Sequence, residues 1–328
     1  MFDGGSGHDT VVVDFSSALY LVPGGATSVT FGLVGNTWVF ALNGATKLAA
    51  STVEAVIVVV SADHSTLIGG PGDDSFFIAK GDAVVAGAGG NDFVELFKLV
   101  AGHLTLDGGS GQDMFALNFT PETAKSAEAP IVLDLRGAVG SLTIGALRAN
   151  LTGFETFQMY GSAWSDVVYS GDGNDVISEN RDSESGNDLF DGGGGDDTLS
   201  GGRGDDTLLG GMENHSFFSL GGADFMAGGS GNDRLYAAGG ADPLLGGADD
   251  DVVSVQFQQA DSAATLKQLD GGTGFDILEW SDGRSRPQTL TVDLNKGIYS
   301  FGIGGVIVAT ASNSTSAPVA EPSARALL

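Results

Sequence analysis

The sequence predicts an all-β fold in which short strands coil into a parallel β-solenoid. The first reason is a nine-residue period, because residues 183–254 divide without gaps into eight nonapeptides. The second is an apolar residue at the eighth position of every copy, which at 42% apolar content has a chance probability of about one in a thousand. The third is that no segment shows a helical period that we would assign. The nonapeptides are SESGNDLFD, GGGGDDTLS, GGRGDDTLL, GGMENHSFF, SLGGADFMA, GGSGNDRLY, AAGGADPLL and GGADDDVVS.

Each nonapeptide predicts one tight turn followed by one very short strand. Glycines in the first four positions permit positive φ and let backbone approach backbone closely. The last three residues form the strand, with the eighth side chain directed inward and its neighbours outward. Because a turn and a strand reverse the chain, two nonapeptides complete a coil of 18 residues. Successive coils then stack as parallel strands, about 4.8 Å apart.

Shorter arrays and single copies share this frame. Residues 60–95 hold four copies and residues 161–178 hold two. Single copies stand at 4–12, 108–116 and 271–279, and each opens a longer segment of alternating apolar residues that predicts ordinary β-strands.

We therefore predict a repeat array that longer strand-rich inserts interrupt. The predicted segments are 1–59 (one repeat and a β-strand insert), 60–116 (first array), 117–160 (β-strand insert), 161–279 (main array), 280–310 (C-terminal strands) and 311–328 (a tail rich in Ser, Ala and Pro, expected to be disordered).

The strongly negative net charge of the chain limits the classes of partner that it is expected to bind. The chain has 42 acidic and 14 basic residues, a formal net charge of -28, and no cysteine. Nucleic acid and anionic membranes would be repelled, so we expect no nucleic-acid partner. We also expect no membrane insertion, because the longest apolar run, Ala55 to Val60, is far shorter than the roughly 20 residues of a membrane span. Without thiolates, a bound metal is expected to be a hard ion on oxygen ligands.

Stacked turns bring carboxylates together and thereby predict the ligand. The sixth position of the main array is Asp in seven copies and His in one. Unpaired carboxylates about 5 Å apart repel by about 3 kcal/mol at an effective dielectric of about 20. A divalent cation removes this repulsion and can use both carboxylate and turn carbonyl oxygens. Ca²⁺ accepts six or more such ligands whereas Mg²⁺ needs a tighter octahedron, so we predict several Ca²⁺ ions.

The pattern GGxGxDxUx, where U is a large apolar residue, resembles the RTX (repeats-in-toxin, haemolysin-type) calcium-binding repeat. The resemblance extends to about residue 279 and implies a right-handed parallel β-roll that is disordered at low calcium. It also implies folding in extracellular calcium after export through a type I secretion apparatus with an uncleaved C-terminal signal. The alternative to a disordered tail at 311–328 is therefore a part of that secretion signal. The metal ligands that it implies are Asp9, Asp74, Asp92, Asp113, Asp175, Gly186, Asp188, Gly193, Gly195, Asp197, Gly202, Gly204, Asp206, Asp224, Gly229, Gly231, Asp233, Asp242, Asp251 and Asp276.

Departures from the pattern predict uneven sites in the first array. Asp74 and Asp92 are one coil apart and should share an ion, and Asp113 should extend the same side. The opposite side offers Ser65 and Ala83 at the ligand position and should hold no ion.

In the main array, GGMENHSFF carries Glu213 for the fourth glycine and His215 for the ligand Asp, which predicts a weakened site. Pro243 lacks a backbone donor and predicts a local defect or a sheet edge. One side of this array should carry Asp197, His215, Asp233 and Asp251, and the other Asp188, Asp206, Asp224 and Asp242.

No catalytic pattern accompanies the repeats. The four histidines form no HExxH motif, and no GxSxG motif occurs. Adjacent pairs such as Asp205 and Asp206 resemble catalytic carboxylates, but neighbouring strand residues face opposite ways. We expect a secreted, extracellular, non-catalytic folding and export module. The alternative is an extracellular polysaccharide-modifying enzyme or a surface adhesin that carries such repeats.

Overall fold

Only β-structure occurs among the residues that the computed structural model describes, in agreement with the predicted all-β class. Within the same residues, no helix has the length and hydropathy needed to cross a membrane. The chain forms two compact units, Met1–Ser162 and Ala163–Leu328. The structure describes residues 2–3, 10–14, 28–34, 37–42, 45–51, 55–60, 64–79, 82–97, 101–118, 129–179, 186–257, 267–274, 276–282, 298–303, 306–312 and 325–327.

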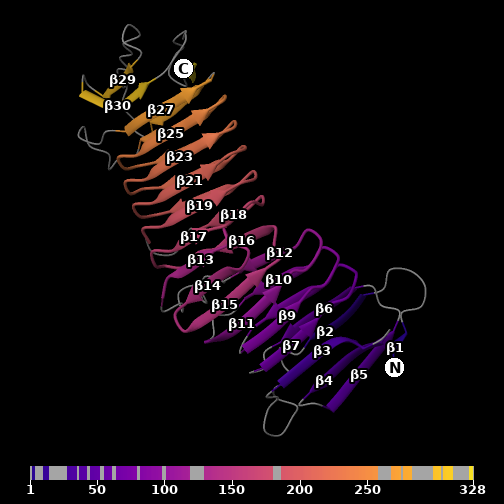
Figure 1. Ribbon diagram of the computed structural model, residues 1–328. Helices are drawn as coiled ribbons and strands as arrows, with labels where there is room; N and C mark the ends of the chain where they lie inside the picture. The colour runs from indigo at the N-terminus through magenta and orange to yellow at the C-terminus, as the bar shows by residue number, and fades with distance from the viewer. Residues whose placement is uncertain are drawn as a thin grey trace. The chain divides into compact units, whose positions relative to one another are not determined.

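The second unit is a parallel β-roll with two sheets (Figure 1). Consecutive strands alternate between the sheets, so each strand pairs with the strand two further along the chain. Partners such as Leu189 and Thr207 are 18 residues apart, which confirms the predicted coil. One sheet contains β17 (Val167–Tyr169), β19 (Leu189–Gly193), β21 (Thr207–Gly211), β23 (Phe225–Ser230), β25 (Pro243–Ala248) and β27 (Lys267–Thr273), and the other contains β18 (Val176–Ser178), β20 (Thr198–Gly202), β22 (Ser216–Leu220), β24 (Arg234–Ala238), β26 (Val252–Phe257) and β28 (Ile277–Asp282).

Two coils of this roll are longer than the others. Val176 of β18 pairs with Thr198 of β20, a step of 22 residues, and Val252 of β26 pairs with Ile277 of β28, a step of 25 residues. The strand registers are therefore kept while the chain between them is lengthened.

The core of the roll is the row of eighth-position side chains. They stack in register between the sheets, and none is more than 3% exposed, which confirms the predicted inward direction. The row consists of Phe190, Leu199, Leu208, Phe217, Met226, Leu235, Leu244 and Val253.

The repeat strands are longer than predicted. β19 includes Gly192 and Gly193, which open the next nonapeptide, and Gly193 pairs with Gly211 of β21. The prediction of a three-residue strand is wrong because extended glycine backbone continues the hydrogen-bonded pairing even though its side chain contributes no packing. The tight turn is thereby limited to the third to sixth positions.

Pro243 causes a local loss of pairing, as predicted, but not a sheet edge. In other coils the seventh-position N–H donates to the carbonyl of the sixth residue one coil earlier, as Phe225 does to Asp206 at 2.7 Å. Proline has no such donor. The pairing of β25 with β23 accordingly starts at Leu244, while Pro243 itself pairs in register with Gln268 of β27.

The first unit has the same two-sheet construction. Its parallel steps include Phe93 with Ser75 and Phe93 with Met114. One sheet contains β2 (Thr10–Asp14), β6 (Ala55–Val60), β8 (Ser75–Ile78), β10 (Phe93–Leu96), β12 (Met114–Leu117) and β16 (Thr156–Tyr160), and the other contains β1 (Phe2–Asp3), β3 (Ser28–Val34), β4 (Thr37–Leu42), β5 (Ala45–Ser51), β7 (His64–Ile68), β9 (Asp82–Ala86), β11 (Gly102–Asp107), β13 (Ile131–Asp134), β14 (Gly140–Ile144) and β15 (Leu147–Thr152).

The insert at 117–160 continues these sheets. β13, β14 and β15 pair antiparallel in succession, and β15 then pairs in parallel with β11. Alternate side chains of these strands, such as Leu133, Leu142 and Leu151, are buried. The insert therefore lengthens a coil and returns the chain to the repeat register.

At the C-terminal end, β29 (Ile298–Ile303) and β30 (Val306–Ser312) form an antiparallel pair, and β30 pairs with β27. β31 (Arg325–Leu327) pairs antiparallel with β28. Where it is described, the predicted disordered tail thus forms strand, because it covers an edge of β28 whose backbone groups would otherwise lack partners.

Candidate metal centre

Sixth-position carboxylates form ladders along the coils. The Asp188 N–H donates to Asp206 Oδ1 at 2.9 Å, and the Asp233 N–H donates to Asp251 Oδ1 at 2.9 Å. The same bond recurs from coil to coil, so each carboxylate uses one oxygen to hold the preceding turn. We name three ladders by their ends: the 166–242 ladder (Asp166, Asp188, Asp206, Asp224, Asp242), the 175–276 ladder (Asp175, Asp197, His215, Asp233, Asp251, Asp276) and, in the first unit, the 74–155 ladder (Asp74, Asp92, Asp113, Glu155).

The second carboxylate oxygen is buried. The aspartates of the three ladders are at most 2% exposed. A buried carboxylate oxygen without a donor is destabilising unless a cation or a proton compensates it. Within the described part of the chain, Oδ2 has no hydrogen-bond partner in Asp92, Asp113, Asp188, Asp233, Asp251 and Asp276.

Four of these oxygens, those of Asp92, Asp113, Asp233 and Asp251, each face a cradle, a space that the first-position glycine of the repeat leaves open. A Cβ on Gly228, at the first position of its repeat, would lie within 3.0 Å of both Asp233 Oδ2 and the Gly246 carbonyl oxygen. A Cβ on Gly246 would meet Asp251 Oδ2 and the Gly271 carbonyl oxygen in the same way. At each of these four steps a carboxylate oxygen and a backbone carbonyl oxygen therefore converge on one small space, and this donor set fits Ca²⁺.

The turns add further carbonyl oxygens. The Gly186 carbonyl oxygen lies so close to the Cα of Gly204 that a Cβ on Gly204 would overlap it. The Gly204 carbonyl oxygen likewise leaves no room for a Cβ on Gly222. Positive φ values of 126° and 117° at Gly204 and Gly222 also favour glycine there. Among the predicted turn ligands, positive φ occurs at Gly193, Gly195, Gly202, Gly204, Gly229 and Gly231.

Burial also changes the protonation of these carboxylates. Desolvation is the largest cause, because the charged form loses its hydration, and neighbouring carboxylates of a ladder add to the rise at Asp188. Near neutral pH, the raised pKa of the Asp188 carboxyl therefore keeps it protonated unless a cation replaces the proton. Burial raises the pKa of Asp188 to about 8, of Asp92, Asp206 and Asp251 to about 7, and of Asp224 and Asp233 to about 6.

The predicted sides of the main array agree with the ladders. The 175–276 ladder contains the side predicted through Asp197, His215, Asp233 and Asp251 and continues to Asp276, and the other predicted side lies in the 166–242 ladder.

His215 interrupts the carboxylates of the 175–276 ladder. Its Nδ1 accepts the Asp197 N–H at 3.3 Å, and its Nε2 lies 2.9 Å from the Met212 carbonyl oxygen. The imidazole therefore replaces the aspartate in the hydrogen-bonded ladder but has no second carboxylate oxygen that could bind a cation. Glu213 beside it has a φ of 69°, a left-handed conformation that favours the glycine of the other repeats.

In the first unit, Asp113 joins the ladder of Asp74 and Asp92, since the Asp92 N–H donates to Asp113 Oδ1 at 2.7 Å. The opposite side pairs Ser65 with Ala83 and offers no carboxylate at the ligand position, so its lack of an ion stays a prediction. The predicted ligand Asp9 lies outside the described residues.

Sequence reasoning missed several polar residues at these turns. Asp166 occupies the sixth position of the copy at 161–169 and is fully buried, and Glu155 ends its ladder by accepting the Asp113 N–H. A separate row of hydrogen bonds joins the fifth positions. In this row each N–H donates to the side chain one coil earlier rather than one coil later, as the Asn232 N–H does to Asn214 Oδ1 at 2.7 Å. The recurrence of Asn and Asp at the fifth position was the signal for it.

The comparisons with known proteins agree with this geometry. The family model for the RTX calcium-binding nonapeptide repeat matches residues 158–178, 182–214 and 218–253, with four copies. These segments are RTX calcium-binding nonapeptide repeats. The RTX repeats form the β-roll, and the β-roll binds calcium.

No curated protein matches the chain significantly. Among solved structures, the crystal structure of extracellular lipase LipA from Serratia marcescens is similar at 15% sequence identity, covering 83% of this chain and 42% of that chain with a TM-score of 0.26. The chain thus spans less than half of the length of that lipase.

Proposed function

We propose that this chain is a non-catalytic module of a secreted protein that folds when its β-roll binds several Ca²⁺ ions outside the cell. The buried second oxygens of the ladder aspartates carry this proposal. In the folded coil these oxygens are buried, and those of Asp92, Asp113, Asp233 and Asp251 face a backbone carbonyl oxygen across a glycine. Folding without a cation must therefore protonate these groups or bury their charge, and both alternatives are unfavourable above neutral pH.

This linkage suits export through a type I secretion apparatus. Where calcium is scarce, repulsion along the ladders keeps the chain extended and able to thread through a channel. Where the calcium concentration reaches about 10⁻⁴ to 10⁻³ M, the range in which extracellular modules bind the ion, calcium binding stabilises the folded coils. The same ions then keep the chain on the far side, because a folded β-roll cannot pass back.

The arrangement of adjacent carboxylates supports a non-catalytic role. Asp206 is 1% exposed and belongs to the 166–242 ladder, whereas Asp205 is exposed and accepts the Ala223 N–H at 2.7 Å. The two side chains serve different ladders and do not converge on a common substrate position. Such pairs stabilise turns here, and no acid–base role is needed to account for them.

A calcium titration followed by far-ultraviolet circular dichroism tests the proposal. Chelator-treated protein should give a disordered spectrum that becomes a β-spectrum with half-saturation on the order of 10⁻⁴ to 10⁻³ M Ca²⁺. Equal concentrations of Mg²⁺ should not produce this change, because the ion is smaller and retains its water. A β-spectrum that is already complete in chelator, or that Mg²⁺ restores equally well, would contradict calcium-dependent folding.

A further inference from the structure

One step of the 166–242 ladder differs from the glycine cradles. The register of β18 with β20 pairs Ser178 with Ser200, so Glu179 stands level with Gly201, the first-position glycine of its repeat. The Glu179 N–H donates to the Ser200 carbonyl oxygen at 2.8 Å, which fixes this placement. Glu179 is only 4% exposed. A carboxylate side chain therefore enters the space that glycine leaves open elsewhere.

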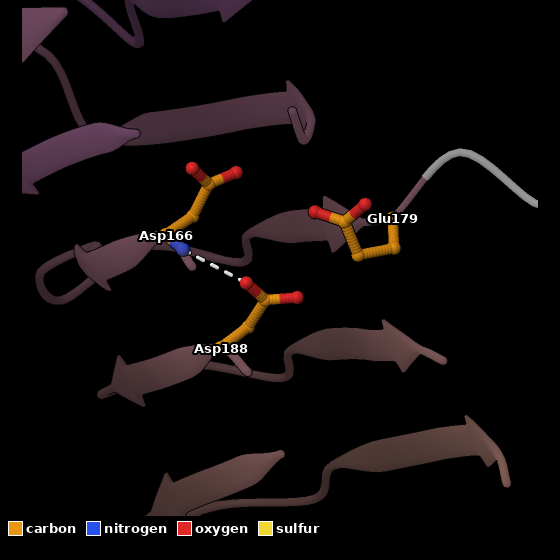
Figure 2. A group of neighbouring side chains, drawn as sticks. All are labelled: Asp166, Glu179 and Asp188. Carbon is orange, nitrogen blue, oxygen red and sulfur yellow. Dashed lines mark hydrogen bonds between the residues drawn. The ribbon is translucent and has the colours of Figure 1, made fainter. Parts of the chain in front are cut away.

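Three carboxylates converge at this step (Figure 2). One oxygen from each of Asp166, Glu179 and Asp188 lies within 4.8 Å of the other two, and all three residues are buried. Asp166 and Asp188 come from adjacent coils and are joined by the Asp166 N–H, which donates to Asp188 Oδ1 at 2.8 Å. Glu179 reaches the group from the end of β18, on the other sheet.

Asp188 supplies an independent sign of a ligand. Its Oδ2 is buried without a hydrogen-bond partner, and the residue is 2% exposed. A backbone oxygen is also at hand, because a Cβ on Gly186 would lie 2.6 Å from both the Trp164 carbonyl oxygen and Asp188 Oδ1. The group therefore combines three carboxylates with a nearby carbonyl, which is a donor set for a hard divalent cation.

On the same ladder, Gly201 is the next first position, and the two first positions after it also lack a carboxylate. Ser219 Oγ donates to Asp224 Oδ2 at 2.7 Å, so a hydroxyl rather than a cation satisfies that oxygen. Ala237 follows at the same position one coil later and adds a buried methyl group but no ligand. The carboxylate at Glu179 is thus a feature of the first step, next to the lengthened coil.

We propose that Asp166, Glu179 and Asp188 form a three-carboxylate calcium site whose ion binds more tightly than the ions of the two-carboxylate steps. The proposal rests on the calcium-dependent folding described above and adds a rank order among the ions. Calcium affinity rises with the number of charged ligands. A third carboxylate also favours divalent over monovalent cations. At rising calcium, this step would fill first and order the start of the main array.

Calorimetric titration of the chelator-treated full chain with Ca²⁺, together with equilibrium dialysis to count ions, tests the rank order. The unsubstituted chain should show one ion with a dissociation constant at least about tenfold below the others. Glu179→Gln and Glu179→Gly should both remove this tight ion while the β-spectrum at saturating calcium is retained. The glycine variant recreates the cradle of Gly201 and so guards against a folding defect caused by the buried amide.

Glu213→Gln is the matched control. It removes the same negative charge from the same unit. The Glu213 side chain is exposed, however, and its Oε2 accepts a hydrogen bond from the Gly195 N–H at 3.2 Å. The tight ion should persist in this variant. Retention of the tight ion in both Glu179 variants, or its equal loss in Glu213→Gln, would overturn the three-carboxylate site while leaving calcium-dependent folding intact. Absence of calcium binding in the unsubstituted chain would overturn both proposals.

Discussion

Replacing Gly228 with alanine should weaken calcium binding at one step of the 175–276 ladder. Gly228 does not have positive φ, so its backbone accepts alanine and the effect comes from the added methyl group alone. That methyl group would lie within 3.0 Å of Asp233 Oδ2 and of the Gly246 carbonyl oxygen, where the ion is expected. Overpacking of this kind typically costs about 1 to 3 kcal/mol, equivalent to roughly 5- to 150-fold in the affinity of the affected ion.

Gly194→Ala provides the control for this change. Its Cβ would have its nearest neighbour, the Asp172 Cα, at 3.6 Å, which is ordinary contact, and its backbone also accepts alanine. This variant should bind calcium as the unsubstituted chain does and be slightly more stable, by about 0.4 to 1 kcal/mol, because alanine restricts the unfolded chain. Calorimetric calcium titration compares the two variants. Equal affinities in both would refute the cradle as the ion position.

Two further predictions concern charge along the ladders. Because burial raises the folded-state pKa of Asp188 to about 8 and of Asp206 to about 7, from 3.8, the metal-free fold binds more protons than the unfolded chain between pH 4 and 8. The stability of the metal-free fold is therefore largest at the acid end of this window and is lost as the pH rises through 7 to 8. Chelator-treated protein should accordingly gain β-signal in far-ultraviolet circular dichroism when the pH is lowered from 8 to 5.5. The absence of such a gain would contradict the burial of these carboxyls. His215→Asp should restore the missing carboxylate between Asp197 and Asp233 and raise the number of ions counted at saturating calcium, and an unchanged count would mean that the histidine rung does not limit binding.

The repeat architecture could be predicted from sequence because it depends on short-range periodicity. The eighth-position residues from Phe190 to Val253 are buried as the nine-residue period requires, and the 18-residue coil follows from two such units. Asp113 could be placed on the ladder of Asp74 and Asp92 despite a step of 21 residues, since three extra residues are easily accommodated outside the strand register.

The remaining features depend on register and on backbone contacts that composition does not reveal. A gapless division puts Ser183 at the first position of its repeat, but the pairing of β18 with β20 assigns that position to Glu179. The step from β18 to β20 is 22 residues rather than 18, so the nine-residue period alone does not show that Glu179 takes the place of Ser183. The extension of the strands into Gly192 and Gly193 was likewise hidden, because glycine has a low strand preference and only the pairing with the next coil reveals it.

Hydrogen exchange with and without calcium is the most direct test of the claim that a metal is needed to hold the stacked turns together. At pH 7.5 and low ionic strength, backbone amides of β19 to β26 should be protected in millimolar Ca²⁺ and should exchange rapidly after chelation. The ladder amides, such as that of Asp233, should lose protection together with the strands. Full protection of these strands in chelator would show that the coils are stable without metal and would contradict this central claim.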